Sequence, residues 1–133
     1  MPEPGRGLLD TSVVIDLDEI DPEVLPEESA ISAVSLAELA AGPHATDDEE
    51  EKAKRQDRLL WAAVTWDPIP FDADAARMYG RVFAAARAAG RTSRTRVADL
   101  LVASTAAASG LPLYTRNPSD FYSFEQLLVV RAV

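Results

Sequence analysis

The chain of 133 residues has no cysteine and a single histidine, His44. Without cysteine it can form neither a disulfide bond nor a thiolate zinc site, and it has no cysteine nucleophile. A Ser-His-Asp triad would depend on His44, and a cluster of histidine metal ligands cannot be built at all. Any catalysis by this chain is therefore expected to depend mainly on carboxylates.

Long apolar segments are missing as well. No apolar run reaches the roughly 18 to 20 residues needed to span a bilayer. The first residues, MPEPGRG, have neither the charged start nor the apolar stretch of a secretion signal. These absences predict a soluble, cytoplasmic protein without a membrane partner, and the length predicts one domain over residues 1–133.

Basic residues are scarce in the first part of the chain, and the net charge is -9. Residues 1–51 contain 15 acidic residues and one basic residue, whereas residues 52–133 contain 12 basic and 7 acidic residues. Six arginines and no acid lie from Arg77 to Arg96. The overall charge argues against nucleic-acid binding, but this basic strip could hold phosphates. The alternative for such a run is the solvent-exposed face of a helix.

Strand-like runs alternate with helical segments along the sequence. This alternation predicts an α/β fold with a parallel sheet covered by helices on both faces. In such folds the functional site lies beyond the carboxyl ends of the strands. Strands are expected at residues 7–9, 29–35, 112–115 and 127–133, and helices after Asp10, at 36–41, 47–64 and 72–89, and from Arg96 to a stop at Gly110.

Two acidic residues follow the first two strand-like runs. Asp10 lies at the first strand-to-helix junction, where a helix N-cap alone would explain it. Glu38 completes the sequence SLAE, which matches an S-x-x-E capping box with Ser35 as the cap. The functional alternative is that Glu38 points into a cleft from the first turn of its helix. Taken singly, both residues favour capping.

Three further polar residues lie in the last third of the chain. Asp99 is in an apolar helix, and a carboxylate there needs a partner, which could be Arg96 three residues earlier or a bound cation. Asn117 and Asp120 follow a strand in the sequence NPSD, which is ordinary turn chemistry. The parallel sheet would nevertheless gather all these groups at one edge. Clustered carboxylates suit Mg²⁺ or Mn²⁺, which can support hydrolysis of phosphodiester bonds.

The order of LLDTSVVID, SAVSLAELAAG and RVADLLVASTAAASGLPLYTRNPSDF along the chain resembles the PIN-domain ribonucleases, specifically VapC-like toxins of type II toxin–antitoxin pairs. The resemblance covers nearly the whole chain. It implies a three-layer α/β/α domain with a central, mostly parallel β-sheet. It also implies cleavage of RNA that depends on a divalent metal ion, Mg²⁺ or Mn²⁺.

The resemblance also implies roles for individual residues. Asp10, Glu38 and Asp99 fall on the three metal-binding acids of the family, and Asn117 stands where many relatives have a fourth acid, with Asp120 three residues later. The expected catalytic set is therefore Asp10, Glu38, Asp99, Asn117 and Asp120. Substrate contacts are expected from Thr11, Ser12, Arg94, Arg96 and Thr115.

The expected partners are a cognate VapB-like antitoxin, an RNA substrate of the tRNA or rRNA class, and a second copy of the chain in a homodimer. In the family, helices in the region of residues 47–64 help to form the antitoxin groove and the dimer. The apolar residues there could form such a surface or could pack in the core; they are Leu59, Leu60, Trp61, Val64 and Trp66.

Two other functions compete with the ribonuclease toxin. Asn117 in the fourth acidic position favours a catalytically weak module that acts mainly by binding its antitoxin in an operon-repressing complex. A flap or single-strand DNA nuclease on a related fold is the other alternative, although the short chain shows no insertion for DNA binding.

Overall fold

The computed structural model describes residues 5–91 and 96–133, and a parallel sheet lies at its centre. Its strands follow the order β2-β1-β3-β4, and every neighbouring pair is parallel. The expected parallel sheet is therefore confirmed. The strands are β1 (Arg6–Leu9), β2 (Glu28–Ala30), β3 (Leu113–Thr115) and β4 (Val130–Ala132).

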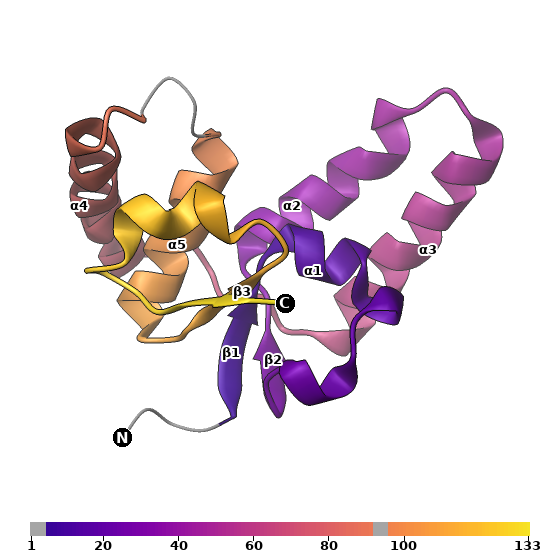
Figure 1. Ribbon diagram of the computed structural model, residues 1–133. Coiled ribbons are helices and arrows are strands. Elements are labelled where there is room, and N and C mark those ends of the chain that lie inside the picture. The colour runs from indigo at the N-terminus through magenta and orange to yellow at the C-terminus, as the bar shows by residue number, and fades with distance from the viewer. Residues whose placement is uncertain (1–4, 92–95) are drawn as a thin grey trace.

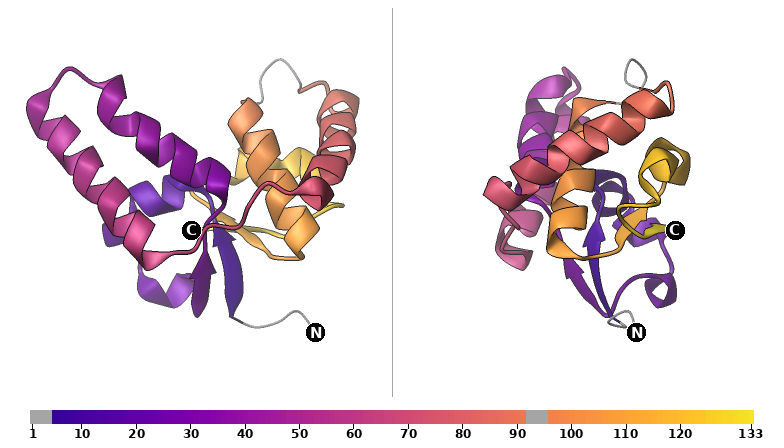
Figure 2. Two further views of the ribbon diagram at one scale, coloured as in Figure 1. Left: turned by 180° about the vertical axis from the view of Figure 1, so that it is seen from behind. Right: turned by 90° about the vertical axis from the view of Figure 1, so that its left-hand side faces the viewer.

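Helices cover both faces of this sheet, as the α/β/α prediction requires (Figures 1 and 2). In β1, Leu8 and Leu9 are both fully buried but belong to different apolar clusters, because successive side chains of a strand point to opposite faces. The α-helices are α1 (Thr11–Ile15), α2 (Ala33–Ala41), α3 (Glu49–Thr65), α4 (Ala73–Ala88) and α5 (Val97–Ser109). The 3₁₀ helices are η1 (Leu17–Glu19), η2 (Pro22–Val24), η3 (Gly42–Ala45) and η4 (Pro118–Phe124).

Each face of the sheet has its own core. The cluster around Leu8 includes Val82 of α4, Val102 of α5 and Phe121 of η4. The cluster around Leu9 is built from α1, α2 and α3. The sheet therefore separates α1–α3 from α4, α5 and η4, and β1 contributes to both layers.

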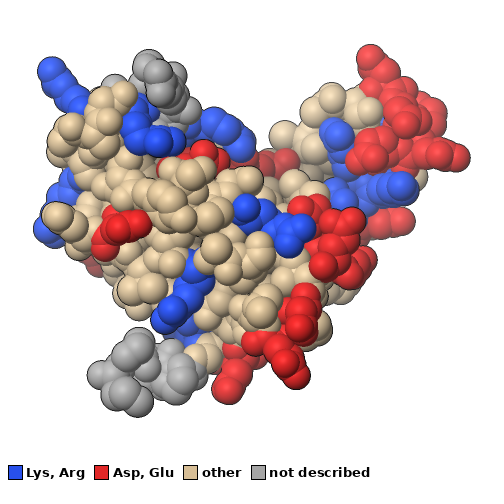
Figure 3. Space-filling view, viewed as in Figure 1, with Lys and Arg blue, Asp and Glu red and all other residues tan. Residues whose placement is uncertain are grey.

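The two layers diverge above the carboxyl ends of the strands. In Figure 1, α2 and α3 form one arm and α4 and α5 form the other, with the sheet where the arms meet. The space-filling view in Figure 3 is hollowed between these arms. The position expected for the functional site is therefore open to solvent.

Helix boundaries differ from the prediction at one important place. The second strand ends at Ala30, and α2 begins at Ala33 with Ser32 as its N-cap. The Ser32 hydroxyl accepts a hydrogen bond from the Ser35 amide at 3.0 Å. The capping box centred on Ser35 is therefore wrong, and Glu38 lies in the second turn of α2 rather than in the first.

The stops of the later helices are confirmed. Helix α5 begins after Arg96 and ends at Gly110, whose φ of 66° is in the left-handed region that glycine adopts most easily. Helix α4 ends just before Gly90, where φ is 71°. Both helices can end in this left-handed conformation because glycine has no side chain that would strain the backbone there.

The apolar residues of α3 and its C-cap Trp66 divide between core and surface. Leu59 and Trp66 are half-buried and pack against the cluster around Leu9. Leu60, Trp61 and Val64 are exposed, Val64 to 84%. Core packing therefore holds for Leu59 and Trp66, and a binding surface formed by the other three residues stays a prediction. Within residues 5–91 and 96–133, none of the helices combines the length and the apolar character that crossing a membrane requires.

Candidate active site

Asp10 follows β1 at its carboxyl end and is the N-cap of α1, so the predicted cap is confirmed. It is buried, and its Oδ1 accepts a hydrogen bond from the Thr11 amide at 2.9 Å. Its Oδ2 accepts from the hydroxyls of Ser12 at 2.8 Å and Thr115 at 2.9 Å. These contacts use both lone pairs of Oδ2 but leave one lone pair on Oδ1, so Asp10 is fixed in orientation and can still bind a cation.

Thr115 donates a hydrogen bond to Asp10 and does not line the cleft. Its side chain is fully buried at the end of β3, and its hydroxyl oxygen also accepts a hydrogen bond from the Asn117 amide at 3.0 Å. The position of Thr115 therefore gives no support to the predicted contact with substrate. The parallel pairing of β1 and β3 makes it a positioning residue for Asp10.

A chain of hydroxyl groups positions Glu38. Thr11 Oγ1 lies 2.6 Å from Glu38 Oε1 and 2.8 Å from Ser35 Oγ, and Ser32 Oγ lies 3.3 Å from Ser35 Oγ. An ionised glutamate can only accept, so the single Thr11 proton goes to Glu38 and Ser35 donates to Thr11. Thr11 is thus engaged with protein groups, although it borders the cleft.

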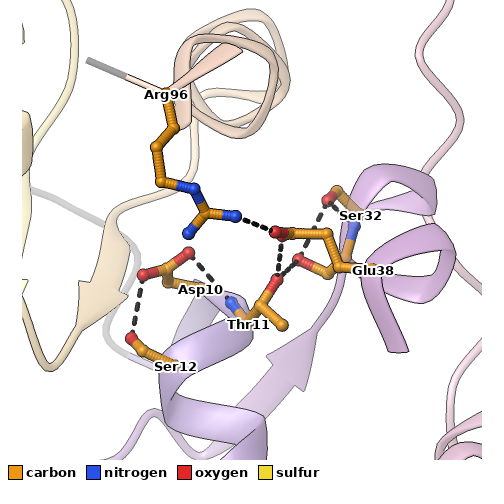
Figure 4. A network of polar contacts seen from close by, with 7 residues as sticks. Asp10, Thr11, Ser12, Ser32, Glu38 and Arg96 are labelled. Atoms are coloured by element: carbon orange, nitrogen blue, oxygen red, sulfur yellow. Dashed lines mark hydrogen bonds and ion pairs between the residues drawn. The ribbon is translucent and has the colours of Figure 1, made fainter. Parts of the chain in front are cut away.

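Arg96 forms an ion pair with Glu38. Its Nη2 lies 2.6 Å from Glu38 Oε2, and Figure 4 shows the guanidinium extending over Asp10 toward Glu38. This hydrogen bond raises the pKa of Arg96, and the nearby charge of Asp99 acts in the same direction. The prediction considered Asp99 as the partner of Arg96, but the direct hydrogen bond goes to Glu38.

Asp99 is buried in the first turn of α5. Burial, followed by repulsion from Asp10, raises its pKa to about 6, although Arg96 opposes this shift. Burial also raises the pKa of Asp10, against the hydrogen bonds from Ser12 and Thr115. In the described residues, no hydrogen bond reaches the Asp99 carboxylate. Two close carboxylates that resist ionisation are a typical cation site.

The fourth position is shared by two residues that both line the cleft. Asn117 is exposed and precedes η4, and Asp120 is half-buried within η4. Asp120 is close enough to raise the pKa of Asp99 by charge repulsion. Asp120 therefore brings a negative charge into the part of the cleft where Asn117 also lies.

A single cleft of about 410 Å³ brings the predicted groups together, a volume within the roughly 300–1,000 Å³ range of ligand sites. Its far wall comes from α3, and sequence reasoning missed the residues there. Glu51, Arg55 and Arg58 have helical spacing, which places them on one face, but only the packing of α3 shows that this face borders the acids. The predicted residues that line the cleft are Asp10, Thr11, Ser12, Glu38, Arg96, Asp99, Asn117 and Asp120.

The basic strip contributes little to the cleft. Arg77, Arg81 and Arg87 lie on α4 with exposed side chains and are not among the residues that line it. Arg77 instead pairs with Asp74 on the same helix. Arg94, another predicted substrate contact, lies outside the described residues. Of the strip as far as the structure describes it, only Arg96 lines the cleft, so the solvent-exposed alternative holds for α4.

The donor set of the cleft fits a hard divalent cation. Asp10, Glu38 and Asp99 offer only oxygen atoms, which Mg²⁺ and Mn²⁺ prefer. In the arrangement observed for residues 5–91 and 96–133, no three acidic or histidine side chains converge on one point as a metal ion would require. The Arg96 guanidinium interacts with all three acids.

Comparison with known proteins identifies a family that this chain matches. The model of the PIN domain matches residues 7–126 of the chain. Ribonuclease VapC5 of Mycobacterium tuberculosis (strain ATCC 25618 / H37Rv) is 34% identical over 125 residues, which are 92% of this chain and 90% of that protein. Ribonuclease VapC8 of the same strain is 36% identical over 105 residues, or 78% of this chain and 93% of that protein.

A solved structure shows the same fold. The crystal structure of VapBC-5, from the VapBC family of toxin–antitoxin systems in Mycobacterium tuberculosis, is similar with a TM-score of 0.84 and 35% sequence identity. The similarity covers 98% of both chains. The similarity therefore extends over the sheet, both arms and the cleft between them.

Proposed function

The chain belongs to the PIN domain family, and from this we propose that it is an endoribonuclease toxin of a type II toxin–antitoxin pair, neutralised by a cognate antitoxin. The observation that carries the proposal is that Asp10, Glu38, Asp99 and Asp120 line one cleft at the carboxyl edge of the sheet. Relatives named as ribonucleases span most of the chain.

The proposed cofactor is Mg²⁺ or Mn²⁺, held by Asp10, Glu38 and Asp99. Such an ion would supply an activated water and would stabilise charge on the phosphoryl oxygens. The protein's own part is to hold the ligands. Thr115 and Ser12 orient Asp10, Thr11 orients Glu38, and burial disfavours the charge of the Asp99 carboxylate, which a bound cation would stabilise.

The proposed substrate is cellular RNA of the tRNA or rRNA class, with Ser12 and Arg96 at the cleft as the first contacts. Arg96 lines the cleft with a largely exposed side chain, so its guanidinium would be available to a substrate phosphate. Homodimer formation through the exposed face of α3 and a cytoplasmic location remain predictions. Leu60, Trp61 and Val64 give α3 an apolar surface that such a dimer or the antitoxin could cover.

The test is cleavage of total cellular RNA by purified protein freed of its antitoxin, with Mg²⁺, with Mn²⁺ and with EDTA. Cleavage that requires a divalent ion and is lost in Asp99→Asn is expected. Because the variant is purified in the same way, it also reports contaminating nuclease. Equal cleavage by Asp99→Asn and the parent would contradict the assignment of the site.

The alternative is a weak module that mainly binds its antitoxin and represses their operon. Asn117 favours it, because an amide replaces an acid at the cleft. Asp120 weakens this alternative, since it supplies a carboxylate to the same place. Under the alternative, antitoxin-free protein would cut no RNA in either ion, and Asn117→Asp would create activity.

A further inference from the structure

One cation of the cleft, Arg58, acts on the charge of nearby Glu51 without a direct hydrogen bond to it. Arg58 on α3 is half-buried and lines the cleft with the acids. Among residues 5–91 and 96–133 it forms no hydrogen bond and no ion pair. Its nitrogen atoms are not among the buried polar atoms that lack a partner, so the guanidinium is open to solvent and available to a ligand in the cleft.

Its neighbour Arg55 shows the contrast. The Nε of Arg55 donates to Glu51 Oε2 at 2.9 Å, and its Nη1 donates to the Gly42 carbonyl at 2.9 Å. Arg55 therefore ties α3 to the end of α2 and is fully used in building that wall. Arg58, one turn later on the same helix, borders the same cleft with its donors unused.

Position and charge identify the kind of ligand. An anion that reaches Asp10 and Asp99 is repelled by the acids, so its binding requires cations around them. Arg96 is at the start of α5 on one arm, and Arg58 is on α3, which belongs to the other arm (Figure 1). A guanidinium matches the geometry of phosphate oxygens. A chain of phosphates running across the cleft would meet one arginine on each side of the acids.

We propose that Arg58 binds a backbone phosphate of the RNA substrate next to the one that is cut, on the α3 side of the cleft. This inference rests on the proposed function for the identity of the substrate. It assigns substrate binding to an arm that the sequence did not indicate. Contacts with phosphates position the RNA and do not read its bases, so Arg58 is expected to act on RNA of any sequence.

The experiment measures binding without cleavage. A fluorescein-labelled, mixed-sequence single-stranded RNA is titrated with the Asp99→Asn protein in EDTA, and fluorescence anisotropy is recorded over a series of salt concentrations. Arg58→Ala is expected to weaken binding about fivefold or more and to reduce the slope of log K against log salt by about 0.7, the value for one phosphate contact. Arg58→Lys keeps the charge and should retain most of that slope.

Lys54→Ala is the matched control. Lys54 is an exposed residue of the same helix, and it does not line the cleft with the acids. Lys54→Ala removes one positive charge, as Arg58→Ala does, but at a position outside the cleft. It should therefore change the slope much less than Arg58→Ala. Alanine favours helix at both positions, and circular dichroism checks that α3 is intact.

Three results would overturn the inference. Arg58→Ala and Lys54→Ala could have equal effects, which would mean that only the overall charge matters. Arg58→Ala could leave RNA binding unchanged and weaken binding of the purified antitoxin, which would place Arg58 in that interface. The parent protein could also fail to bind single-stranded RNA. Failure of the proposed function is detected separately, as absence of RNA cleavage by the wild-type protein.

Discussion

The Thr115 hydroxyl donates a 2.9 Å hydrogen bond to Asp10 Oδ2 across 105 residues of sequence. It does so because β1 and β3 are parallel neighbours that end at the same edge of the sheet. The same hydroxyl oxygen accepts from the Asn117 amide. One buried threonine therefore fixes the orientation of Asp10 and the start of the loop that carries Asn117.

Thr115→Val tests this positioning role. Valine keeps the shape of the side chain but removes the donor to Asp10 and the acceptor for the Asn117 amide. Unfolding by urea should show a loss of about 1–3 kcal/mol. RNA cleavage should fall through kcat, with little change in KM. The control is Thr105→Val, because Thr105 is also buried and bonds only within α5, to the Leu101 carbonyl. A similar fall in kcat for both variants would argue against a specific role.

Two serines of α2 should behave differently. Ser32→Ala removes the N-cap of the helix and should cost about 1 kcal/mol of stability. Ser35→Ala removes the donor to Thr11, which orients Glu38, so it should reduce cleavage more than Ser32→Ala does. Thermal melts and cleavage rates measured on both variants decide this. If Ser35→Ala lost stability but no activity, the hydroxyl chain would have only a structural role.

The stability of the protein should depend on pH through Asp99. Its pKa rises from 3.8 unfolded to about 6 folded, so the folded state binds the proton more tightly. The stabilisation is complete below about pH 4 and is lost as the pH rises through 6. In EDTA, Asp99→Asn should therefore melt a few degrees above the parent at pH 7.5.

That difference should shrink toward pH 4, where Asp99 of the folded parent is protonated and as neutral as the asparagine. Asp57→Asn, at an exposed position on α3, removes the same charge away from the acidic cluster and serves as the control. Differential scanning calorimetry over pH 4–8 measures the effect. A difference between Asp99→Asn and the parent that did not change with pH would contradict a raised pKa of Asp99 in the folded protein.

Arg96 should compete with a metal ion for Glu38. The Arg96 side chain is 67% exposed, so loss of the ion pair should cost at most about 1 kcal/mol. Arg96→Gln removes a positive charge beside three acids, so Mn²⁺ should raise the melting temperature at lower concentrations than in the parent. Asp99→Asn should show little response to Mn²⁺. Higher Mn²⁺ concentrations needed by Arg96→Gln would mean that Arg96 supports the metal site.

The sequence determined the sheet, the helix stops and the acids, because each depends on local patterns. Apolar runs followed by Asp10 or by the TRNPSD turn mark strand ends, and Gly90 and Gly110 mark helix ends whatever the rest of the chain does. The α2 cap was missed because Ser32 and Ser35 are both good caps. The length of the preceding strand, which depends on pairing with β1, selects Ser32.

Only the tertiary structure decided which charges meet. Arg96 pairs with Glu38, 58 residues away, and not with the nearby Asp99, because α2 and α5 come from opposite layers and approach each other at the sheet edge. Arg55 and Arg58 look in sequence like the basic face of a surface helix, yet they line the cleft. The sequence places residues on a helix face by its period, but the packing of whole helices determines what that face meets.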